Sequence, residues 1–264
     1  VAVIVAESDT VTIYDGDDTS LPMWMVFSGI APAWTHVLWN TVSSVSMLNG
    51  DLLIGDTSGS GGGLIQTKFT SDTIYKWYTG TGNGGTWNGS IETRNDTLSY
   101  AKDLVGLLVN TVVNDVAMTV LPNAPIDAAT GLPVPTIAVA TAGGVSVIKD
   151  DGTVEGAGTG FNVRGIAADT LGFTIVKSSS YTPYIRYAFG PTITETHSFS
   201  SYSAAAAGGY YVGVGRLWSD KNSVEYLQND VFAVNSSEGL DQVLVGEYVA
   251  DRKNKSLIAR TTST

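Results

Sequence analysis

Apolar and polar residues alternate in short runs along much of the chain, and turn-forming residues separate the runs. In TIAVATAGGVSVIKDDGTV (residues 136–154), apolar side chains on both faces of the first run predict a strand that is covered on both sides. Ala142-Gly143-Gly144 suits a tight turn, and Lys149–Gly152 suits a second, polar turn. VNDVAMTV (residues 113–120) predicts an earlier strand. The region is therefore predicted to form a meander of four antiparallel strands.

The same pattern recurs elsewhere in the chain. Residues 5–18 align with residues 139–152 without a gap through the second strand. Further copies are predicted at residues 42–69, 165–190 and 229–248. The predicted equivalent positions are Val5, Ile54, Val139, Val176 and Val234. Most intervals between them suit a four-stranded unit of about 40–50 residues.

Repeated meanders predict an all-β fold. One meander cannot cover both of its own faces, whereas a ring of meanders gives each sheet two neighbours. We therefore expect a β-propeller of four-stranded antiparallel blades, with five blades preferred and six or seven as alternatives. A two-sheet sandwich is the competing architecture. Residues 1–264 are expected to form a single propeller domain, in which residues 79–112 are an insertion or a degenerate blade.

The first copy begins at what would be the second strand of a blade. Residues 256–264 (SLIARTTST) read as a strand, and we expect them to complete the first blade by pairing with it. The chain starts with Val1 rather than Met, which predicts a processed product or a piece of a longer protein.

Composition narrows the range of partners. The formal net charge is −11 at pH 7, which makes binding to nucleic acid or to anionic membranes unfavourable. We expect no membrane insertion, because no apolar run approaches the length needed to cross a bilayer. The chain has no Cys, which excludes disulfides, thiolate metal ligands and thiol nucleophiles.

Candidate catalytic and metal-binding patterns are weak. GSGGG (residues 59–63) follows a strand like a phosphate-binding loop, but no helix and no Walker lysine follow, so a hairpin turn is preferred. His36 and His197 lie in no recognisable catalytic motif. The acidic turns at residues 14–18 and 149–152 lack the ligand spacing of a calcium loop. No catalytic, cofactor-binding or metal-binding residue is assigned, and no cofactor is expected.

Carboxylates provide the main enzymatic alternative. Asn-Asp-Val occurs at residues 114–116 and 229–231, so Asp115 and Asp230 are candidates for an acid/base pair at the mouth of a propeller channel. The simpler interpretation is that Asn-Asp opens a strand because both residues favour turns.

The tryptophans and the Asn-x-Ser/Thr sequons can each be interpreted in two ways. Tryptophans exposed at a channel mouth would bind sugars or proteins, whereas packing between blades is the commoner use of large rings. The residues are Trp24, Trp34, Trp39, Trp77 and Trp87. Asn-x-Ser/Thr sequons occur at Asn88, Asn95, Asn235 and Asn254, and a Ser/Thr-rich chain produces such sequons by chance.

Two segments carry a resemblance to a known group of proteins. Residues 113–154 and the closing DQVLVGEYVADRKNKSLIARTTST (residues 241–264) resemble the propeller region of virion structural proteins, such as tail-fibre-like proteins, of marine tailed phages. TIAVATAGGVSVI resembles, more loosely, the propeller repeats of bacterial two-component sensors. The phage resemblance covers most of residues 110–264 and identifies no catalytic residue.

The phage resemblance implies a function. We expect a non-enzymatic virion module, in a tail fibre or similar appendage, that serves as a rigid scaffold or a docking and adsorption platform. Its expected partners are other virion proteins, copies of itself, and a host surface glycan or receptor. Its expected location is the extracellular virion, with secretion or a bacterial cell surface as the alternative. A polysaccharide-cleaving propeller glycosidase and a bacterial sensor or adhesion propeller are the alternative functions.

Overall fold

The computed structural model describes most of the chain. The described residues are 1–29, 38, 41–58, 61–79, 85–96, 98–101, 107–178, 184–199, 221–228, 231–236 and 239–244. Within them, every regular element is a β-strand, and all of the strand pairs are antiparallel. The predicted all-β class is confirmed for this part of the chain.

The strands form five meander sheets in chain order. The first sheet contains β1 (Ala2–Ala6), β2 (Thr10–Asp15) and β3 (Met23–Ser28). The second contains β4 (Val42–Leu48), β5 (Asp51–Asp56), β6 (Gly63–Lys68), β7 (Thr73–Trp77), β8 (Gly85–Trp87) and β9 (Tyr100–Ala101). The third contains β10 (Val113–Thr119), β11 (Thr136–Thr141), β12 (Gly144–Ile148) and β13 (Val154–Ala157).

The last two sheets follow the same order. The fourth contains β14 (Val163–Ala168), β15 (Gly172–Lys177), β16 (Tyr184–Ala188) and β17 (Thr194–Phe199). The fifth contains β18 (Lys221–Gln228), β19 (Val231–Ser236) and β20 (Gly239–Leu244).

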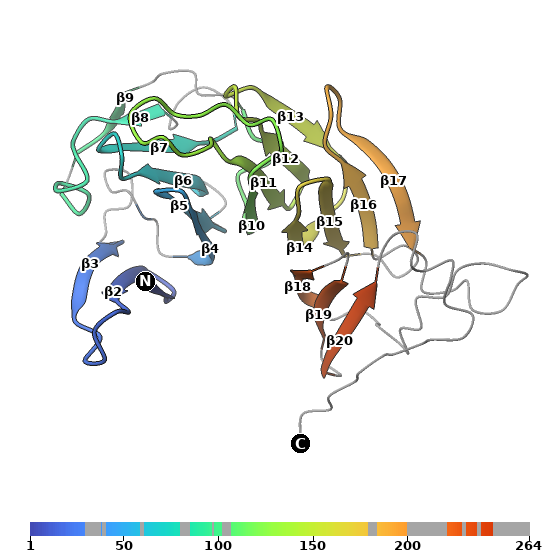
Figure 1. The fold of residues 1–264 in the computed structure, drawn as a ribbon, viewed down its shortest axis with the longest axis horizontal. Helices are drawn as coiled ribbons and strands as arrows, with labels where there is room; N and C mark the ends of the chain where they lie inside the picture. Colours follow the sequence, from blue (N-terminus) through green and yellow to red (C-terminus); the bar gives the residue numbers. More distant parts are fainter. Residues whose placement is uncertain are drawn as a thin grey trace, which may run out of the picture.

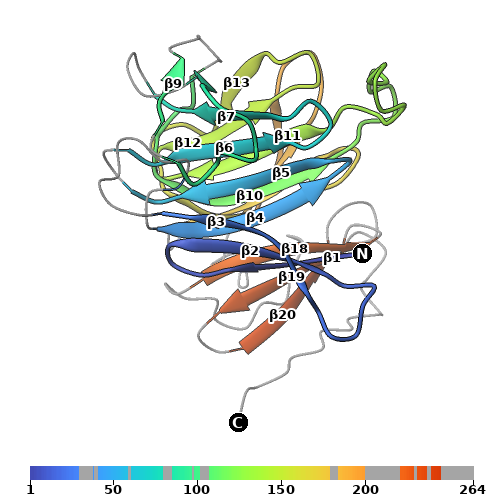
Figure 2. The ribbon, with the colours of Figure 1, turned by 90° about the vertical axis from the view of Figure 1, so that its left-hand side faces the viewer.

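The five sheets follow one another around an open arc (Figure 1). Strands β4, β10, β14 and β18 contact one another in sequence along the inner side of the arc, and we call them the inner strands. The first and fifth sheets stand at the two ends of the arc, and the loop between β10 and β11 projects from one rim (Figure 2). The arrangement is that of propeller blades. Closure of the ring and the number of blades stay predictions.

Hydrophobic layers fill the spaces between neighbouring sheets. Each middle sheet contributes alternate residues to both sides, as the sequence pattern predicts for strands covered twice. The layer between the first and second sheets includes Val11, Ile13, Phe27, Leu52 and Ile54. The layer between the second and third includes Leu53, Leu64, Val116 and Val139, and the next includes Ala138, Val145, Ile166, Phe173 and Ile175.

Strand pairing confirms the alignment of the first copy with the third sheet. Ala6 pairs with Val11 as Ala140 pairs with Val145. β1 is therefore the counterpart of the second strand β11, and the first sheet has no counterpart of the inner strand among the described residues. Residues 256–264, which are predicted to supply it, lie outside the described residues, so that pairing stays a prediction.

One predicted equivalence is wrong by a single residue. Ile54 pairs with Val45 and Val139 with Val116, and the corresponding pair in the fourth sheet joins Ile175 to Ile166. Val176 instead pairs with Gly165, so it lies on the opposite face of its strand. Consecutive apolar residues in this strand are buried on both faces, which hides its register from sequence inspection.

The segment 79–112 extends the second sheet. In its described part, β8 pairs with β7 and β9 pairs with β8, so these two strands extend the second sheet and form no separate sheet. The loop before β9 also holds the first sheet. Asn95 Nδ2 donates to Val26 O at 3.0 Å, and Ser28 N donates to Asn95 Oδ1 at 2.9 Å. Arg94 Nε donates to the same Val26 carbonyl.

Two turns behave as their sequences predict. At Asn49-Gly50 both residues have positive φ, 52° and 85°, as a type I′ two-residue hairpin turn requires. The GSGGG segment joins β5 and β6, which are antiparallel neighbours, so it serves as a hairpin connection. Residues 59 and 60 of that segment lie outside the described residues.

Candidate functional site: the inner strands

A β-bulge occurs at the same place in every inner strand. The pairing shifts between Val42 and Ser44 in β4, between Val113 and Asp115 in β10, between Val163 and Gly165 in β14, and between Lys221 and Ser223 in β18. The surrounding sequences are VSSV (42–45), VNDV (113–116), VRGI (163–166) and KNSV (221–224). Bulges re-aim side chains, and here they re-aim a polar one.

The side chain at the bulge binds the next sheet. Ser43 Oγ donates to Val113 O at 2.7 Å. Asn114 Nδ2 donates at 2.7 Å to Val163 O, which is the equivalent carbonyl one sheet further on. It also lies 2.7 Å from Asn162 Oδ1. The same interaction is therefore repeated across two successive sheet interfaces.

Asp115, the residue after the bulge, links three sheets. Its Oδ1 accepts a hydrogen bond of 2.6 Å from Ser44 Oγ in the second sheet. Its Oδ2 accepts one of 2.9 Å from Ile166 N in the fourth sheet. Oδ1 also accepts from Val116 N at 2.9 Å. Because both carboxylate oxygens are engaged in contacts between sheets, the side chain is placed to hold the inner strands together. We call these contacts and those of Ser43 and Asn114 the inner-strand latches.

A backbone hydrogen bond accompanies each latch. A residue just beyond the second strand donates its N–H to the carbonyl just before the inner strand. The three bonds are Thr57 N to Thr41 O at 3.0 Å, Ala142 N to Val112 O at 3.0 Å, and Ser178 N to Asn162 O at 2.8 Å. Their spacing matches the equivalence of Ile54, Val139 and Ile175.

The predicted pairing of Asp115 with Asp230 is not an equivalence of position. Val231 begins β19, the second strand of its sheet, whereas Val116 lies in an inner strand. The position in the fifth sheet that corresponds to Asp115 is Ser223. Asp230 itself lies outside the described residues. The repeated phrase Asn-Asp-Val therefore occurs in two different strands of the repeat.

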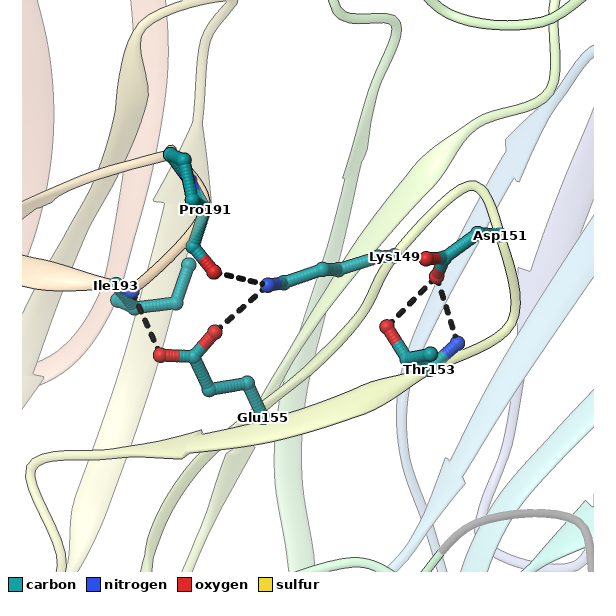
Figure 3. A network of polar contacts seen from close by, with 6 residues as sticks. All are labelled: Lys149, Asp151, Thr153, Glu155, Pro191 and Ile193. Carbon is teal, nitrogen blue, oxygen red and sulfur yellow. Dashed lines mark hydrogen bonds and ion pairs between the residues drawn. The ribbon is translucent and has the colours of Figure 1, made fainter.

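The acidic turn at 149–152 forms a second contact between sheets (Figure 3). Lys149 Nζ lies 2.8 Å from Glu155 Oε2 and donates to Pro191 O at 2.9 Å, while Glu155 Oε1 accepts from Ile193 N at 2.7 Å. The hydrogen bond from Lys149 and the one from Ile193 N lower the pKa of Glu155. The turn thus ties the third sheet to the connection between β16 and β17.

The carboxylates of the acidic turns bind their own backbone. Asp151 accepts from Thr153 Oγ1 at 2.6 Å and Thr153 N at 2.9 Å, and these bonds lower the pKa of Asp151. Asp18 accepts from Ser20 N and Ser20 Oγ, each at 2.8 Å. Both segments are hairpin turns, as preferred from sequence. The described residues include no cluster of three or more His, Cys, Asp or Glu placed to hold a metal ion.

A buried lysine in β7 is not predicted by any sequence motif. Lys76 lies on the face of the second sheet that is turned toward the first, and it is 2% exposed. Burial lowers the pKa of Lys76 to about 7, and the nearby Asp56 partly opposes this. Its Nζ lies 5.6 Å from the ring centre of Tyr100, whose pKa burial raises. The only sequence signal is one charged residue between the aromatic residues of the strand TIYKW.

The histidine candidates do not form a site in the described region. His197 lies in β17 opposite Arg186, and His36 lies outside the described residues.

The described part of the chain also contains no helix able to cross a bilayer.

Tryptophans pack mainly between strands. Trp77 is buried and donates to Gln66 Oε1 at 3.0 Å, and Trp87 is buried edge-to-face against Tyr100. Trp24 in β3 differs, because its side chain is 58% exposed. Its ring centre lies 5.5 Å from that of Phe69, which follows β6 of the second sheet. Trp34 and Trp39 lie outside the described residues.

The sequons also divide. Asn88 is exposed and donates to Ser99 Oγ at 2.8 Å, whereas the Asn95 side chain is engaged in holding β3. Asn235 lies in β19, and Asn254 falls outside the described residues.

The described fold and its polar contacts define an all-β protein, in which successive blade-like sheets are joined at their inner strands. No protein-family model matches the chain, and no curated protein matches it. Solved structures that match include BBS1N in complex with ARL6DN, at 12% identity and a TM-score of 0.46, covering 91% of this chain and 59% of that one.

Two other solved structures give similar values. A functionally unknown protein from Desulfotomaculum acetoxidans matches at 11% identity and a TM-score of 0.46, covering 99% of this chain and 65% of that one. The extracellular domain of the hybrid two-component system BT4673 from B. thetaiotaomicron matches at 12% identity and a TM-score of 0.43, covering 100% of this chain and 32% of that one. The chain thus spans less than two thirds of each of these three chains, and we take no function from them.

Proposed function

We propose that this chain is a non-enzymatic β-propeller module of a phage virion, part of a tail fibre or similar appendage. In this proposal residues 1–264 form one domain, its sheets are the blades of a ring with five blades, and six or seven blades are the alternatives. The module serves as a rigid scaffold and docking or adsorption platform.

The observation that carries the scaffold role is the engagement of Asp115. A propeller glycosidase needs a pair of carboxylates whose oxygens face the substrate. Here one carboxylate oxygen of Asp115 accepts from Ser44 Oγ and the other from Ile166 N, so both oxygens are hydrogen-bonded to neighbouring sheets. Together with the latches of Ser43 and Asn114, this favours mechanical rigidity over chemistry at that position.

The virion assignment is supported by the resemblance of residues 113–154 and 241–264 to phage structural proteins. It implies that the module contacts other virion proteins or further copies of itself, and that it presents a surface to a host glycan or receptor. The net charge of −11 disfavours a nucleic-acid partner.

The test is the location of the protein. Particles purified from an infected culture are analysed by mass spectrometry, and an antibody to the chain is used for immunogold labelling. We expect peptides of this chain in the particles and gold at the tail or its appendages. Detection only in host cytosol, or release of reducing sugar from envelope polysaccharide that is lost in Asp115→Asn, would contradict the proposal.

A further inference from the structure

The connection between β10 and β11 is much longer than its counterparts in two other sheets. Asn49-Gly50 joins β4 to β5, and residues 169–171 join β14 to β15. Residues 120–135 join β10 to β11, and this segment stands out from the rim of the arc (Figure 2). We call residues 120–135 the projection. Connections of this length are uncommon in compact folds, and those that occur often carry a function.

The projection is ordered by its own hydrogen bonds. Asp127 N donates to Leu132 O at 2.9 Å, and the antiparallel bridge between Ile126 and Pro133 continues the same ladder. The chain has eight prolines, and four of them lie in the projection: Pro122, Pro125, Pro133 and Pro135. Each proline restricts the backbone before binding as well as after it. Such a preorganised segment loses little conformational entropy when it binds a partner.

Both the tip and the base of the projection are held in place. At the tip, Asp127 Oδ1 accepts hydrogen bonds of 2.9 Å from Ala129 N and from Thr130 N. At the base, Asn49 Nδ2 in the second sheet donates to Pro133 O at 2.8 Å. The projection is therefore fixed to the second sheet as well as to the third, in which it begins and ends.

Two aliphatic side chains of the projection face solvent. Ile126 is 61% exposed and Leu132 is 43% exposed. Ile126 pairs with Pro133, the residue next to Leu132, so the two aliphatic side chains lie on opposite sides of the ladder. Exposed apolar side chains on a rigid support are typical of contact surfaces. A groove with two apolar walls fits this arrangement.

The projection carries one charged residue, Asp127, which lies opposite Leu132. Hydrogen bonds from Thr130 and Ala129 lower the pKa of Asp127. The carboxylate is therefore ionised at neutral pH, and a cation on the partner matches it.

Neighbouring turns make the same rim acidic. Strand direction alternates in a meander, so the turns after the third strands lie on the same side as the projection. These turns and the equivalent turn after β2 carry exposed carboxylates, those of Asp18, Asp72 and Asp151. Lys149 of this rim is paired with Glu155 at 2.8 Å. An acidic rim repels a second copy of the same rim and attracts a basic surface.

We propose that the projection docks into an apolar groove, rimmed by Lys or Arg side chains, on another protein of the virion. Ile126 and Leu132 contact the two walls of the groove, and Asp127 faces the cations at its rim. Docking of this kind rests on the proposed function, because the partner is a protein of the same particle.

Particles assembled with variant chains test the docking. A phage that lacks its own copy of the gene is grown in host cells that supply the full-length protein, and incorporation into purified particles is measured by quantitative mass spectrometry. Ile126→Ser with Leu132→Ser removes both aliphatic contacts. Leu107→Ser with Leu171→Ser is the matched control, since these side chains are 54% and 67% exposed and lie outside the projection. Denaturant unfolding verifies that both variants fold, as expected for exposed positions.

We expect the projection variant to be incorporated at least about tenfold less than the unaltered protein, and the control variant to be incorporated normally. Equal incorporation of the two variants would overturn docking through the projection and leave the virion assignment intact. Absence of the unaltered protein from the particles would overturn both.

Two further variants test the chemistry of the partner. Asp127→Asn keeps an oxygen acceptor for the turn and removes the charge, so incorporation should fall by about two- to fivefold. Unchanged incorporation would overturn the cationic rim. A photo-crosslinking amino acid in place of Ile126 should join the chain to an apolar segment with adjacent Lys or Arg residues in another virion protein. Crosslinking mainly to a second copy of this chain, or to an acidic segment, would overturn the proposal.

Discussion

The first and third sheets contain the same strand pattern in the same register, but their surroundings differ. Ile13 and Val147, which face the following sheet, are both fully buried. Val5 and Val139 face the other way, and only Val139 is buried. The comparison teaches that burial in this fold is set by the neighbouring sheet rather than by the strand sequence.

The largest expected effect concerns the face toward the following sheet, which is buried in both the first and the third sheet. Ile13→Ala and Val147→Ala each remove a fully buried side chain from a layer between sheets, so each should lower the free energy of unfolding by about 2–4 kcal/mol. Denaturant unfolding followed by fluorescence measures both. Val3→Ala, at an exposed position of β1, is the control. A near-neutral Ile13→Ala would show that the first sheet does not pack on the second.

The next effect concerns β10, the inner strand of the third sheet, which has no described counterpart in the first sheet. Asp115→Ala deprives Ser44 Oγ and Ile166 N of a charged acceptor, and we expect a loss of about 2–3 kcal/mol in the free energy of unfolding. Ser44→Ala removes only one donor and should cost about 1 kcal/mol. Equal, negligible costs for both variants would mean that the inner-strand latches do not hold the sheets.

A smaller effect is expected at the bulge. Asn114→Ala removes the donor to Val163 O, and Ser43→Ala removes the equivalent donor to Val113 O. Each should cost about 0.5–1.5 kcal/mol. Because Asn114 follows Val113 directly in β10, the two costs should be coupled in the double variant. Costs near zero in both single variants would contradict the role of the latches.

The smallest effect is pH-dependent. The pKa of Glu155 is lowered in the folded protein by Lys149, so its contribution is present above the unfolded pKa of about 4.5 and is lost as the pH falls through the folded value. Glu155→Gln should cost less than about 1 kcal/mol at pH 7 because the pair is partly exposed. The cost should shrink below pH 4.5. Glu7→Gln in the first sheet is the matched carboxylate control, and a cost that grows on acidification would contradict the ion pair.

The sequence predicted the repeat more reliably than the contacts between repeats. The gapless alignment of residues 5–18 with 139–152 gives the observed pairing, because both segments have turns of equal length. The equivalence of Val176 failed because Phe173–Val176 is buried on both faces and shows no alternation.

The candidate site was less accessible to sequence reasoning. Asp115 was identified as a possible carboxylate of function, but its phrase Asn-Asp-Val misleads, since the copy at residues 229–231 runs into a second strand. The useful pattern is the bulge tetrapeptide of the inner strands, which varies from VSSV to VRGI and is recognisable only from the pairing shifts. Lys76 gave no pattern because its burial depends on how the second sheet packs.

Hydrogen–deuterium exchange at the amide of Ile166 tests most directly whether the inner-strand latches hold neighbouring sheets together. This amide donates across a sheet interface to Asp115 Oδ2 at 2.9 Å. We predict that it exchanges slowly, and that Asp115→Ala removes this protection while sparing the amide of Thr57, which donates to Thr41 O within the second sheet. Rapid exchange at Ile166 in the unaltered protein would contradict the account.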